Sequence, residues 1–225
     1  MITDCMRSGF SARSRAMAGS AVLRMVPSSD CMKKAMATTQ GIQRADPSAK
    51  QIAFIGDSTF FHSGITGILN AVYNEADLTV ILLDNATTAM TGQQPNPGTG
   101  QTLLGNFSKK ISSEDILRAC GLDFVKKVNP FHLKTAVTTV MAAVAVKGVS
   151  AVIFEAPCIA VAKPQAKQRV DHALCTGCQR CSSEIGCPAI TLTTAGKAEI
   201  NAALCYGCTL CRQICPTKAI GGIPT

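Results

Sequence analysis

The sequence contains no tryptophan, and aromatic residues make up only 4% of its 225 residues. It also lacks a dense stripe of lysine and arginine, although its formal net charge is +8. The basic excess lies at the two ends, with 8 basic and 3 acidic residues in residues 1–50 and 6 basic and 3 acidic residues in residues 166–225. A nucleic-acid-binding surface combines concentrated positive charge with aromatic side chains that stack on bases. We therefore expect no nucleic-acid partner.

Long apolar runs are also absent. No stretch approaches the roughly 18 consecutive apolar residues that a membrane-spanning helix needs. The most apolar run, residues 136–146, is interrupted by Thr138 and Thr139. We therefore expect no membrane span, whereas a hydrophobic content of 47% is sufficient for a globular core. The length suits one medium domain and one small domain.

Cysteine, by contrast, is abundant. Eight of the 12 cysteines form two runs, each with three cysteines two residues apart and a fourth before proline: Cys175, Cys178, Cys181 and Cys187, then Cys205, Cys208, Cys211 and Cys215. Three thiolates at this spacing can wrap a loop around one 4Fe-4S cluster, and in two-cluster ferredoxins the fourth cysteine ligates the other cluster. We predict one cluster on Cys175, Cys178, Cys181 and Cys215, and a second on Cys205, Cys208, Cys211 and Cys187.

A zinc ribbon and a disulfide scaffold are the other interpretations of these cysteines. Zinc ribbons use four ligands in paired CxxC motifs, not two triplets that are each followed by Cys-Pro. A disulfide framework implies secretion, for which no signal peptide is visible. Iron-sulfur clusters need a reducing, low-oxygen interior, so we expect a cytoplasmic location in an anaerobe.

The cysteine-rich region is also an internal repeat. Ala173-Leu174-Cys175-x-Gly177-Cys178 recurs as Ala203-Leu204-Cys205-x-Gly207-Cys208. This pattern resembles the bacterial-type ferredoxin module, which implies a small α+β domain with two 4Fe-4S clusters over residues 161–225. Five residues separate Cys181 from Cys187, compared with three between Cys211 and Cys215, and we expect the extra residues to bulge the loop.

Upstream of this region, short apolar strands alternate with helices. Strands are predicted over residues 51–55, 78–83, 124–128 and 151–154. Helices are predicted over residues 64–73 with Ser63 as the cap, from Ser112 or Ser113 to Gly121, and over residues 132–147. This order predicts an α/β fold with a parallel sheet over residues 39–160. Residues 1–38 are predicted to be irregular or truncated.

Polar residues follow two neighbouring strands of the predicted sheet. Asp57 comes directly after the first strand, and Asn85 follows the second. Because a right-handed crossover brings the carboxyl ends of parallel strands to one edge, these side chains should converge there. Carboxylate and amide oxygens suit Mg²⁺, and the helix that begins near Gly64 should aim its amino terminus at the same place. The sequence therefore predicts a diphosphate–Mg²⁺ site where open α/β sheets bind ligands.

These residues also carry a family resemblance. Gly56-Asp57-Ser58, followed after 25 residues by Asp84-Asn85, resembles the thiamine diphosphate motif, with Ser58 and Asp84 in place of its usual glycine and first asparagine. The stretches 56–74 and 82–100 are similar to the α subunit of indolepyruvate:ferredoxin oxidoreductase, a family that also carries a C-terminal two-cluster ferredoxin module. The resemblance implies that Asp57, Asn85 and the backbone oxygen of Thr87 bind Mg²⁺. It places the diphosphate of the cofactor beside Gly56, Ser58, Thr91 and Gly92, while Gly64 is a candidate cofactor contact through the helix that begins near it.

The activity that the resemblance implies is thiamine-diphosphate-dependent oxidative decarboxylation of an aryl 2-oxoacid such as indolepyruvate. Coenzyme A would take the acyl group, and electrons would pass through two 4Fe-4S clusters to ferredoxin. Enzymes for pyruvate and other 2-oxoacids share the metal motif, so the substrate stays open. His62 is a candidate catalytic residue in contact with substrate or cofactor, with simple loop packing as the alternative.

The 225 residues have no room for the domain that binds the aminopyrimidine ring in thiamine enzymes. We therefore expect a β subunit and a missing N-terminal region as partners, and a truncated or frame-disrupted gene as the origin of residues 1–38. A transit peptide is the alternative for that segment. The alternative function is an electron-transfer iron-sulfur protein without catalysis of its own.

Overall fold

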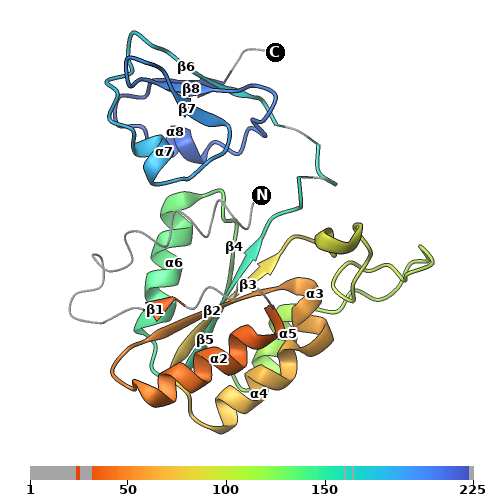
Figure 1. Cartoon of the computed structure of the whole chain (residues 1–225). Coiled ribbons are helices and arrows are strands. Elements are labelled where there is room, and N and C mark those ends of the chain that lie inside the picture. The colour runs from red at the N-terminus through yellow and green to blue at the C-terminus, as the bar shows by residue number, and fades with distance from the viewer. Residues whose placement is uncertain (1–23, 26–31, 160, 164, 223–225) are drawn as a thin grey trace. The chain divides into compact units, whose positions relative to one another are not determined.

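The computed structural model in Figure 1 describes residues 24–25, 32–159, 161–163 and 165–222. The chain forms two compact units, one within residues 15–160 and one within residues 161–225. We call the first the sheet unit and the second the cysteine unit. Among the described residues, no helix is long and apolar enough to cross a membrane.

A parallel sheet forms the centre of the sheet unit. Its strands are β1 (Arg24–Met25), β2 (Gln51–Gly56), β3 (Leu78–Asp84), β4 (Val125–Val128) and β5 (Val149–Glu155), in the spatial order β1-β2-β3-β5-β4. All neighbouring pairs are parallel. Central parallel strands are covered on both faces, which is why β2, β3 and β5 are nearly continuous apolar runs. The predicted α/β fold is confirmed.

Helices α2 (Met32–Ala45), α4 (Ile65–Tyr73) and α5 (Ser113–Ala119) cover one face of this sheet. Met36, Ile68 and Leu117 from these helices are buried against strand side chains such as Ile55, Val80, Leu82 and Ile153. Ser112 begins α5, because its side chain accepts a hydrogen bond of 3.1 Å from the backbone nitrogen of Asp115. Of the two predicted caps, Ser112 is therefore the one used.

Helix α6 (Leu133–Ala145) packs on β3, β4 and β5, at the other face of the sheet. Ala136, Val140 and Ala143 are its buried residues. Thr79 and Ser150, on adjacent strands, place their hydroxyl oxygens 2.9 Å apart, and Ser150 also donates to the carbonyl of Ala143 at 2.8 Å. These bonds satisfy the polar groups that lie beneath the helix.

Lys50 lies directly before β2, at the end of the sheet opposite the predicted site. Its side chain, 7% exposed, forms an ion pair with Asp77 and donates to the carbonyls of Val146 at 2.6 Å and Gly148 at 3.1 Å. Asp77 Oδ1 also accepts a bond of 2.9 Å from the backbone nitrogen of Gly148. One carboxylate thus joins the start of β2 to the turn before β5.

The helical segment after β2 begins earlier than the sequence predicts. Helix α3 (Asp57–Thr59) starts immediately after Gly56 and continues through a π-helical turn, η1 (Phe60–Gly64), into α4. Ser63 is therefore inside the helical segment, so the prediction that it caps a helix from residue 64 is wrong. The buried ring of Phe60 and its edge-on neighbour Phe61, 5.2 Å away, anchor the early turn.

Two elements lie within the stretch 1–38, for which irregular structure was expected. They are β1 and the beginning of α2, and the remaining residues 1–23 and 26–31 lie outside the described residues. Met36 of α2 is 2% exposed in the core beside Gly67. The last part of this stretch therefore belongs to the folded sheet unit.

The cysteine unit contains two similar halves. Strand β6 (Gln168–Val170) pairs antiparallel with β9 (Ile220–Gly222), and β7 (Ile190–Leu192) pairs antiparallel with β8 (Ala198–Ile200). The short helices α7 (Arg180–Ser183) and α8 (Leu210–Ile214) each follow a residue in the left-handed conformation, Gln179 and Thr209. The repeat in the sequence thus corresponds to a repeat in the fold.

Candidate cofactor and metal sites

The carboxyl ends of β2 and β3 meet at one edge of the sheet. Gly56 is in register with Leu83, so Asp57 and the Asp84-Asn85 pair follow neighbouring strands at the same level. The segment after β5 lies alongside them, because Ala156 and Cys158 donate backbone bonds of 3.0 Å to the carbonyls of Asp84 and Asn85. The structure therefore brings the predicted magnesium ligands to one edge.

Asp57 is the most informative residue of this edge. Its side chain is buried, with the residue 3% exposed, and Oδ1 accepts a bond of 2.7 Å from the backbone nitrogen of Ser58. Oδ2 is buried and has no hydrogen-bond partner among the described residues. Burial raises the pKa of Asp57, the bond from Ser58 and the Asn96 side chain lower it, and the charge of Asp84 raises it. A buried carboxylate oxygen without a partner fits a cation ligand.

Asn85 begins the loop that follows β3. Its Oδ1 accepts a bond of 3.2 Å from the backbone nitrogen of Thr87, and Ala86 between them has a positive φ of 58°. Thr87 is buried, at 4% exposed. This tight turn keeps Asn85 and Thr87 together at the sheet edge, as the proposed magnesium ligation requires.

Thr91 and Gly92 lie farther along the same loop. The short helix η2 (Ala89–Thr91) ends at Gly92, whose φ of 110° is in the left-handed region that favours glycine. A bridge between Thr88 and Gln94 closes the turn, and Thr91 donates a bond of 2.6 Å to the side chain of Gln94. Thr91 and Gly92 are exposed, and their predicted contact with a diphosphate stays a prediction.

Asn96 is a buried polar residue that the sequence analysis missed. It is 7% exposed, and its Oδ1 accepts a bond of 2.9 Å from the backbone nitrogen of Gly98. Its Nδ2 makes no hydrogen bond of good geometry with a described residue, yet the side chain lies close enough to Asp57 to lower the pKa of that carboxyl. The residue stands between two prolines in a polar loop, where no periodic pattern marks it.

The remaining predicted residues of this site lie on the helical segment after β2. His62 is exposed on the π-helical turn, and Ser58 is half-buried in the first turn. Gly64 is buried at the end of the π-helical turn, where an added Cβ would lie 2.4 Å from Cδ1 of Ile55. Close packing against β2 therefore accounts for Gly64, and the amino terminus of the segment lies at Asp57 instead.

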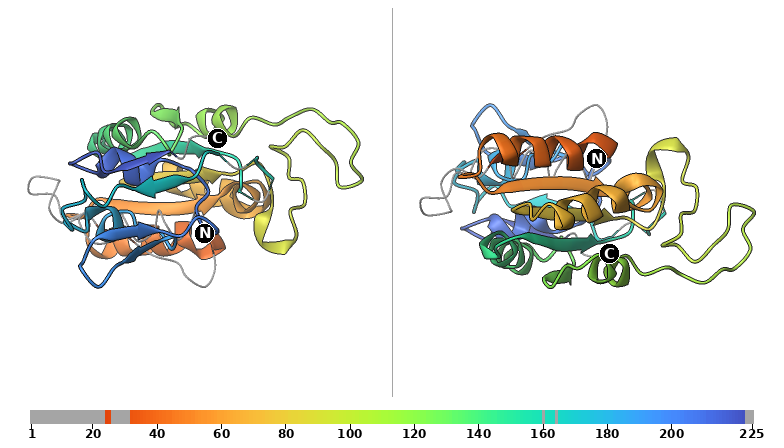
Figure 2. Two further views of the ribbon diagram at one scale, coloured as in Figure 1. Left: turned by 90° about the horizontal axis from the view of Figure 1, so that it is seen from above. Right: turned by 90° about the horizontal axis from the view of Figure 1, so that it is seen from below.

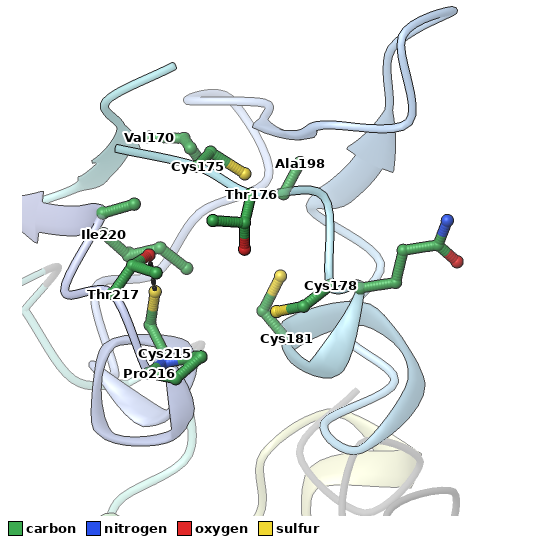
Figure 3. Close-up of a pocket in the computed structure, with 12 residues that line it drawn as sticks. Val170, Cys175, Thr176, Cys178, Cys181, Ala198, Cys215, Pro216, Thr217 and Ile220 are labelled. Carbon is green, nitrogen blue, oxygen red and sulfur yellow. Dashed lines mark hydrogen bonds between the residues drawn. The ribbon is translucent and has the colours of Figure 1, made fainter. Parts of the chain in front are cut away.

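The first group of cysteines surrounds one cavity in the cysteine unit. Cys175, Cys178 and Cys181 approach it from the first cysteine loop (residues 175–181), and Cys215 approaches from the other half of the unit (Figure 3). Cys215 Sγ also lies 3.7 Å from the hydroxyl of Thr217. Val170, Ala198 and Ile220 supply apolar walls. The structure thus groups these four thiols as the spacing predicts.

The second group contains Cys187 and the second cysteine loop (residues 205–211). Cys205, Cys208 and Cys187 are close enough to Cys211 that their charges, together with its burial as the main cause, raise the pKa of Cys211 to about 12. Burial likewise raises the pKa of Cys208. Thiolates crowded in this way need cations beside them to stay ionised.

Both groups have the donor chemistry of iron-sulfur sites. The first places four thiols around one cavity, the second brings three thiols close to Cys211, and all eight cysteines are free of disulfides. Among the described residues, no three His, Cys, Asp or Glu side chains gather tightly as ligands of a single metal ion. Thiols at the corners of a larger cluster stand farther apart than ligands of one ion. The residues therefore fit 4Fe-4S clusters.

Comparisons with known proteins agree with the first of these sites. Residues 15–154 match the family described as thiamine pyrophosphate enzyme, C-terminal TPP binding domain. The chain is also similar in fold to 2-oxoglutarate:ferredoxin oxidoreductase from Magnetococcus marinus, with a TM-score of 0.54 and 20% identity over 59% of this chain and 47% of that chain.

Curated proteins extend the similarity across most of the chain. Indolepyruvate oxidoreductase subunit IorA of Archaeoglobus fulgidus is 40% identical over 197 residues, which cover 84% of this chain and 31% of that protein. The IorA subunit of Methanothermobacter marburgensis is 42% identical over 191 residues, with the same coverage. The 2-oxoglutarate synthase subunit KorB of the latter organism is 27% identical over 103 residues, 43% of this chain and 36% of that protein. The chain thus spans about a third of the length of these relatives.

Proposed function

Because the chain belongs to the thiamine pyrophosphate enzymes, through their C-terminal TPP-binding domain, we propose that it is the diphosphate-binding and electron-transfer portion of a 2-oxoacid:ferredoxin oxidoreductase. Indolepyruvate is the proposed substrate, since two IorA relatives are 40% and 42% identical over 84% of the chain. The net reaction would convert a 2-oxoacid, coenzyme A and two oxidised ferredoxins to an acyl-CoA, carbon dioxide, two reduced ferredoxins and one proton.

The observation that carries this proposal is the buried Oδ2 of Asp57 without a hydrogen-bond partner among the described residues. Burying an ionised carboxylate without compensation is costly, so the position is best explained by a cation that is bound in use. Asn85 and the backbone oxygen of Thr87, fixed by the turn at Ala86, would complete the protein ligands of Mg²⁺. The open positions of the ion would take diphosphate oxygens.

Thiamine diphosphate, when bound, would supply the carbon nucleophile and the electron sink that decarboxylation of a 2-oxoacid requires. The chain's own residues would bind and orient it. Ser58 and Gly56 are next to Asp57 in the chain, and we propose that Thr91 and Gly92, on the loop after Asn85, also contact the diphosphate. His62 is exposed nearby, and we propose that it contacts the substrate.

The cysteine unit would carry the electrons away. We propose that it holds two 4Fe-4S clusters, one on Cys175, Cys178, Cys181 and Cys215 and the other on Cys205, Cys208, Cys211 and Cys187. Oxidation of the 2-oxoacid to the acyl group and carbon dioxide releases two electrons, and two one-electron carriers on the same chain suit their transfer one at a time. Backbone N–H groups near the sulfurs and the surrounding apolar residues would tune the reduction potentials.

A long loop beside the cofactor edge fits the partner region that such an enzyme needs. In Figure 2 the loop between η2 and α5 reaches away from the sheet of its own unit. Leu103, Leu104 and Phe107 are 76%, 87% and 94% exposed on it. Apolar side chains grouped in this way mark an interaction site. We propose that the loop is covered by the aminopyrimidine-binding region, supplied by further chain or by a β subunit.

Calorimetry with thiamine diphosphate tests the first half of the proposal. The chain, alone and with a candidate β subunit, is expected to bind the cofactor only when Mg²⁺ is present, and Asp57→Ala should abolish binding. Absence of binding under every condition would refute the enzyme proposal and leave an electron-transfer protein as the function. With the partner added, indolepyruvate should support faster ferredoxin reduction than pyruvate or 2-oxoglutarate, and the reverse order would reassign the substrate.

Anaerobic reconstitution with iron and sulfide tests the second half. About eight iron atoms and eight sulfides per chain are expected for two cubane clusters. Zinc in place of iron, or iron without acid-labile sulfide, would refute the cluster assignment. A cytoplasmic location in an anaerobe follows from the proposal, because such clusters are unstable in oxygen.

A further inference from the structure

The two cysteine loops have the same spacing but different surroundings. Cys178 in the first loop is exposed, whereas its counterpart Cys208 in the second is only partly accessible. Thr176 is exposed and its counterpart Tyr206 is half-buried. Both loops keep a glycine at a positive φ before the middle cysteine, Gly177 at 70° and Gly207 at 87°, so the backbone itself does not explain the difference.

A short segment that leads into β6, and includes its first residue Gln168, accounts for this difference. We call residues 163 and 165–168 the cover segment. The backbone nitrogen of Gln165 donates to the carbonyl of Tyr206 at 3.1 Å, and the hydroxyl of Tyr206 donates back to the carbonyl of Lys163 at 3.3 Å. These two bonds hold the segment against the second cysteine loop.

The cover segment also touches the loop more closely at two further points. A Cβ added to Gly207 would lie 2.6 Å from the carbonyl oxygen of Ala166, so only glycine permits this approach. The backbone nitrogen of Gln168 lies 3.4 Å from Sγ of Cys205 and donates to it. Gly207 is buried as a result.

The first cysteine loop is covered less. At its equivalent glycine, Gly177, an added Cβ would lie 3.1 Å from the carbonyl oxygen of Gly196, which belongs to the tight turn between β7 and β8. The turn is closed by a hydrogen bond of 2.9 Å from the backbone nitrogen of Gly196 to the carbonyl of Thr193. Thr176 and Cys178 of the first cysteine loop remain exposed to solvent. Figure 3 shows Cys178 next to Cys181 among the residues that line the cavity.

We propose that the cover segment shields the second thiol group, and that an external one-electron carrier therefore reaches the cysteine unit at the first cysteine loop, around Cys178. This inference rests on the proposed function, because it assumes that both thiol groups hold clusters. Each transfer would oxidise the chain by one electron and reduce the carrier by one, with no bond or proton exchanged. Electron transfer needs close approach, and the first loop, with Cys178 exposed, offers a closer one than the second, where Cys208 is only partly accessible.

Partial removal of iron tests the shielding directly. The reconstituted chain is treated with an iron chelator under anaerobic conditions until about half of the iron is lost, then labelled with iodoacetamide and mapped by mass spectrometry. Labelling is expected on Cys175, Cys178, Cys181 and Cys215, and at least about fivefold less on Cys205, Cys208, Cys211 and Cys187. Equal labelling of both groups, or the opposite order, overturns the inference while the clusters themselves stand. A chain that takes up no iron overturns the inference and the proposed function together.

Gly207→Ala and Gly177→Ala form a matched pair for the role of the cover segment. Both add a methyl group at a positive φ, but only Gly207→Ala forces the cover segment away. It should speed iron loss from the second group at least about threefold, whereas Gly177→Ala should leave that rate unchanged. Tyr206→Phe, which removes only the bond to Lys163, gives a milder change in the same direction if Gly207→Ala assembles poorly. Unchanged rates in Gly207→Ala and Tyr206→Phe would show that the segment shields nothing.

Leu174 and Leu204 test where the carrier docks. They are equivalent in the two loops, are similarly exposed at 51% and 48%, and each precedes the first cysteine of its loop. The dithionite-reduced chain is mixed with an oxidised bacterial two-cluster ferredoxin, and its reoxidation is followed by stopped flow. Leu174→Glu should slow this reaction about fivefold or more, and Leu204→Glu should not. Equal effects of the two variants overturn the docking assignment.

Discussion

Asp57→Asn should stabilise the cofactor-free chain and at the same time abolish its response to Mg²⁺ and thiamine diphosphate. The carboxylate is 3% exposed, with Oδ2 unpartnered among the described residues, so the folded chain keeps a buried charge that an amide would remove. Asparagine can still accept the bond that Ser58 donates to Oδ1. A residue held for a bound cation is expected to cost stability when that cation is absent.

The size of the effect follows from the burial. An unsatisfied buried polar group costs about 1–3 kcal/mol, and more when it is charged. Removing the buried charge should raise the free energy of unfolding at pH 7. The gain should be only about 1–2 kcal/mol, because the new amide N–H₂ will lack hydrogen-bond partners of its own. For a unit of this size, each kcal/mol raises Tm by about 2–4 °C.

The effect should also depend on pH. Burial raises the pKa of Asp57 in the folded chain above its ordinary value of 3.8. Between pH 3.8 and this raised folded-state pKa, the folded chain therefore binds more protons than the unfolded chain. Its stability therefore falls as the pH rises through this window. The stabilisation by Asp57→Asn should be full above the folded-state pKa and disappear below pH 3.8.

Thermal unfolding with and without ligand is the assay. At 100 times the Kd, Mg²⁺ and thiamine diphosphate should stabilise the native chain by about 2.7 kcal/mol and leave Asp57→Asn unchanged. Asp84→Asn is the control: its side chain is half-buried, and its Oδ1 accepts a bond of 3.2 Å from the backbone nitrogen of Ala86 that an amide oxygen can also accept, so it should keep the ligand response. A cofactor-free Asp57→Asn chain that melts below the native chain would refute the interpretation of Asp57 as a cation ligand.

Three further predictions concern the sheet unit. Asp77→Ala should lower the free energy of unfolding by roughly 2–4 kcal/mol in urea denaturation, because it leaves the buried charge of Lys50 without its ion-pair partner. A loss no larger than that of Lys50→Met would contradict this explanation. Ser112→Ala should cost about 1 kcal/mol by removing the cap of α5, and an unchanged midpoint would show that the cap is unimportant. Cys120 is 9% exposed and burial raises its pKa, so it should resist iodoacetamide at pH 8 until the chain is unfolded. Prompt labelling at Cys120 in the native chain, mapped by mass spectrometry, would refute its burial.

Much of the sheet unit could be predicted because its strands are apolar runs with polar residues at their ends. The strand predicted over residues 78–83 is observed as Leu78–Asp84, and the one over residues 151–154 as Val149–Glu155. The start of the helical segment after β2 could not be predicted, because the residue before it, Gly56, has no side chain that could cap the helix. Ser63, the best cap by residue type, instead lies in a π-helical turn that packing of Phe60 stabilises.

The candidate sites were predictable where chemistry depends on local spacing. The repeated cysteine pattern points to the two thiol groups, and the position of Asp57 after a strand points to the sheet edge. Asn96 could not be found in this way, since its approach to Asp57 depends on how the loop after Asn85 folds back. The cover segment was equally hidden, because its contacts with Tyr206 and Gly207 are tertiary and its own residues follow no repeat.

The pairing of β6 with β9 has a consequence for how the cysteine unit is joined to other proteins. Gln168 is opposite Gly222 and Val170 is opposite Ile220, so the chain enters and leaves the unit through two adjacent strands. Because its first and last strands lie side by side, such a unit can be joined to another protein at one place, without threading through that protein's fold. Deleting β9 would leave the edge of β6 without its partner, so a transplantable version must keep the chain through Gly222.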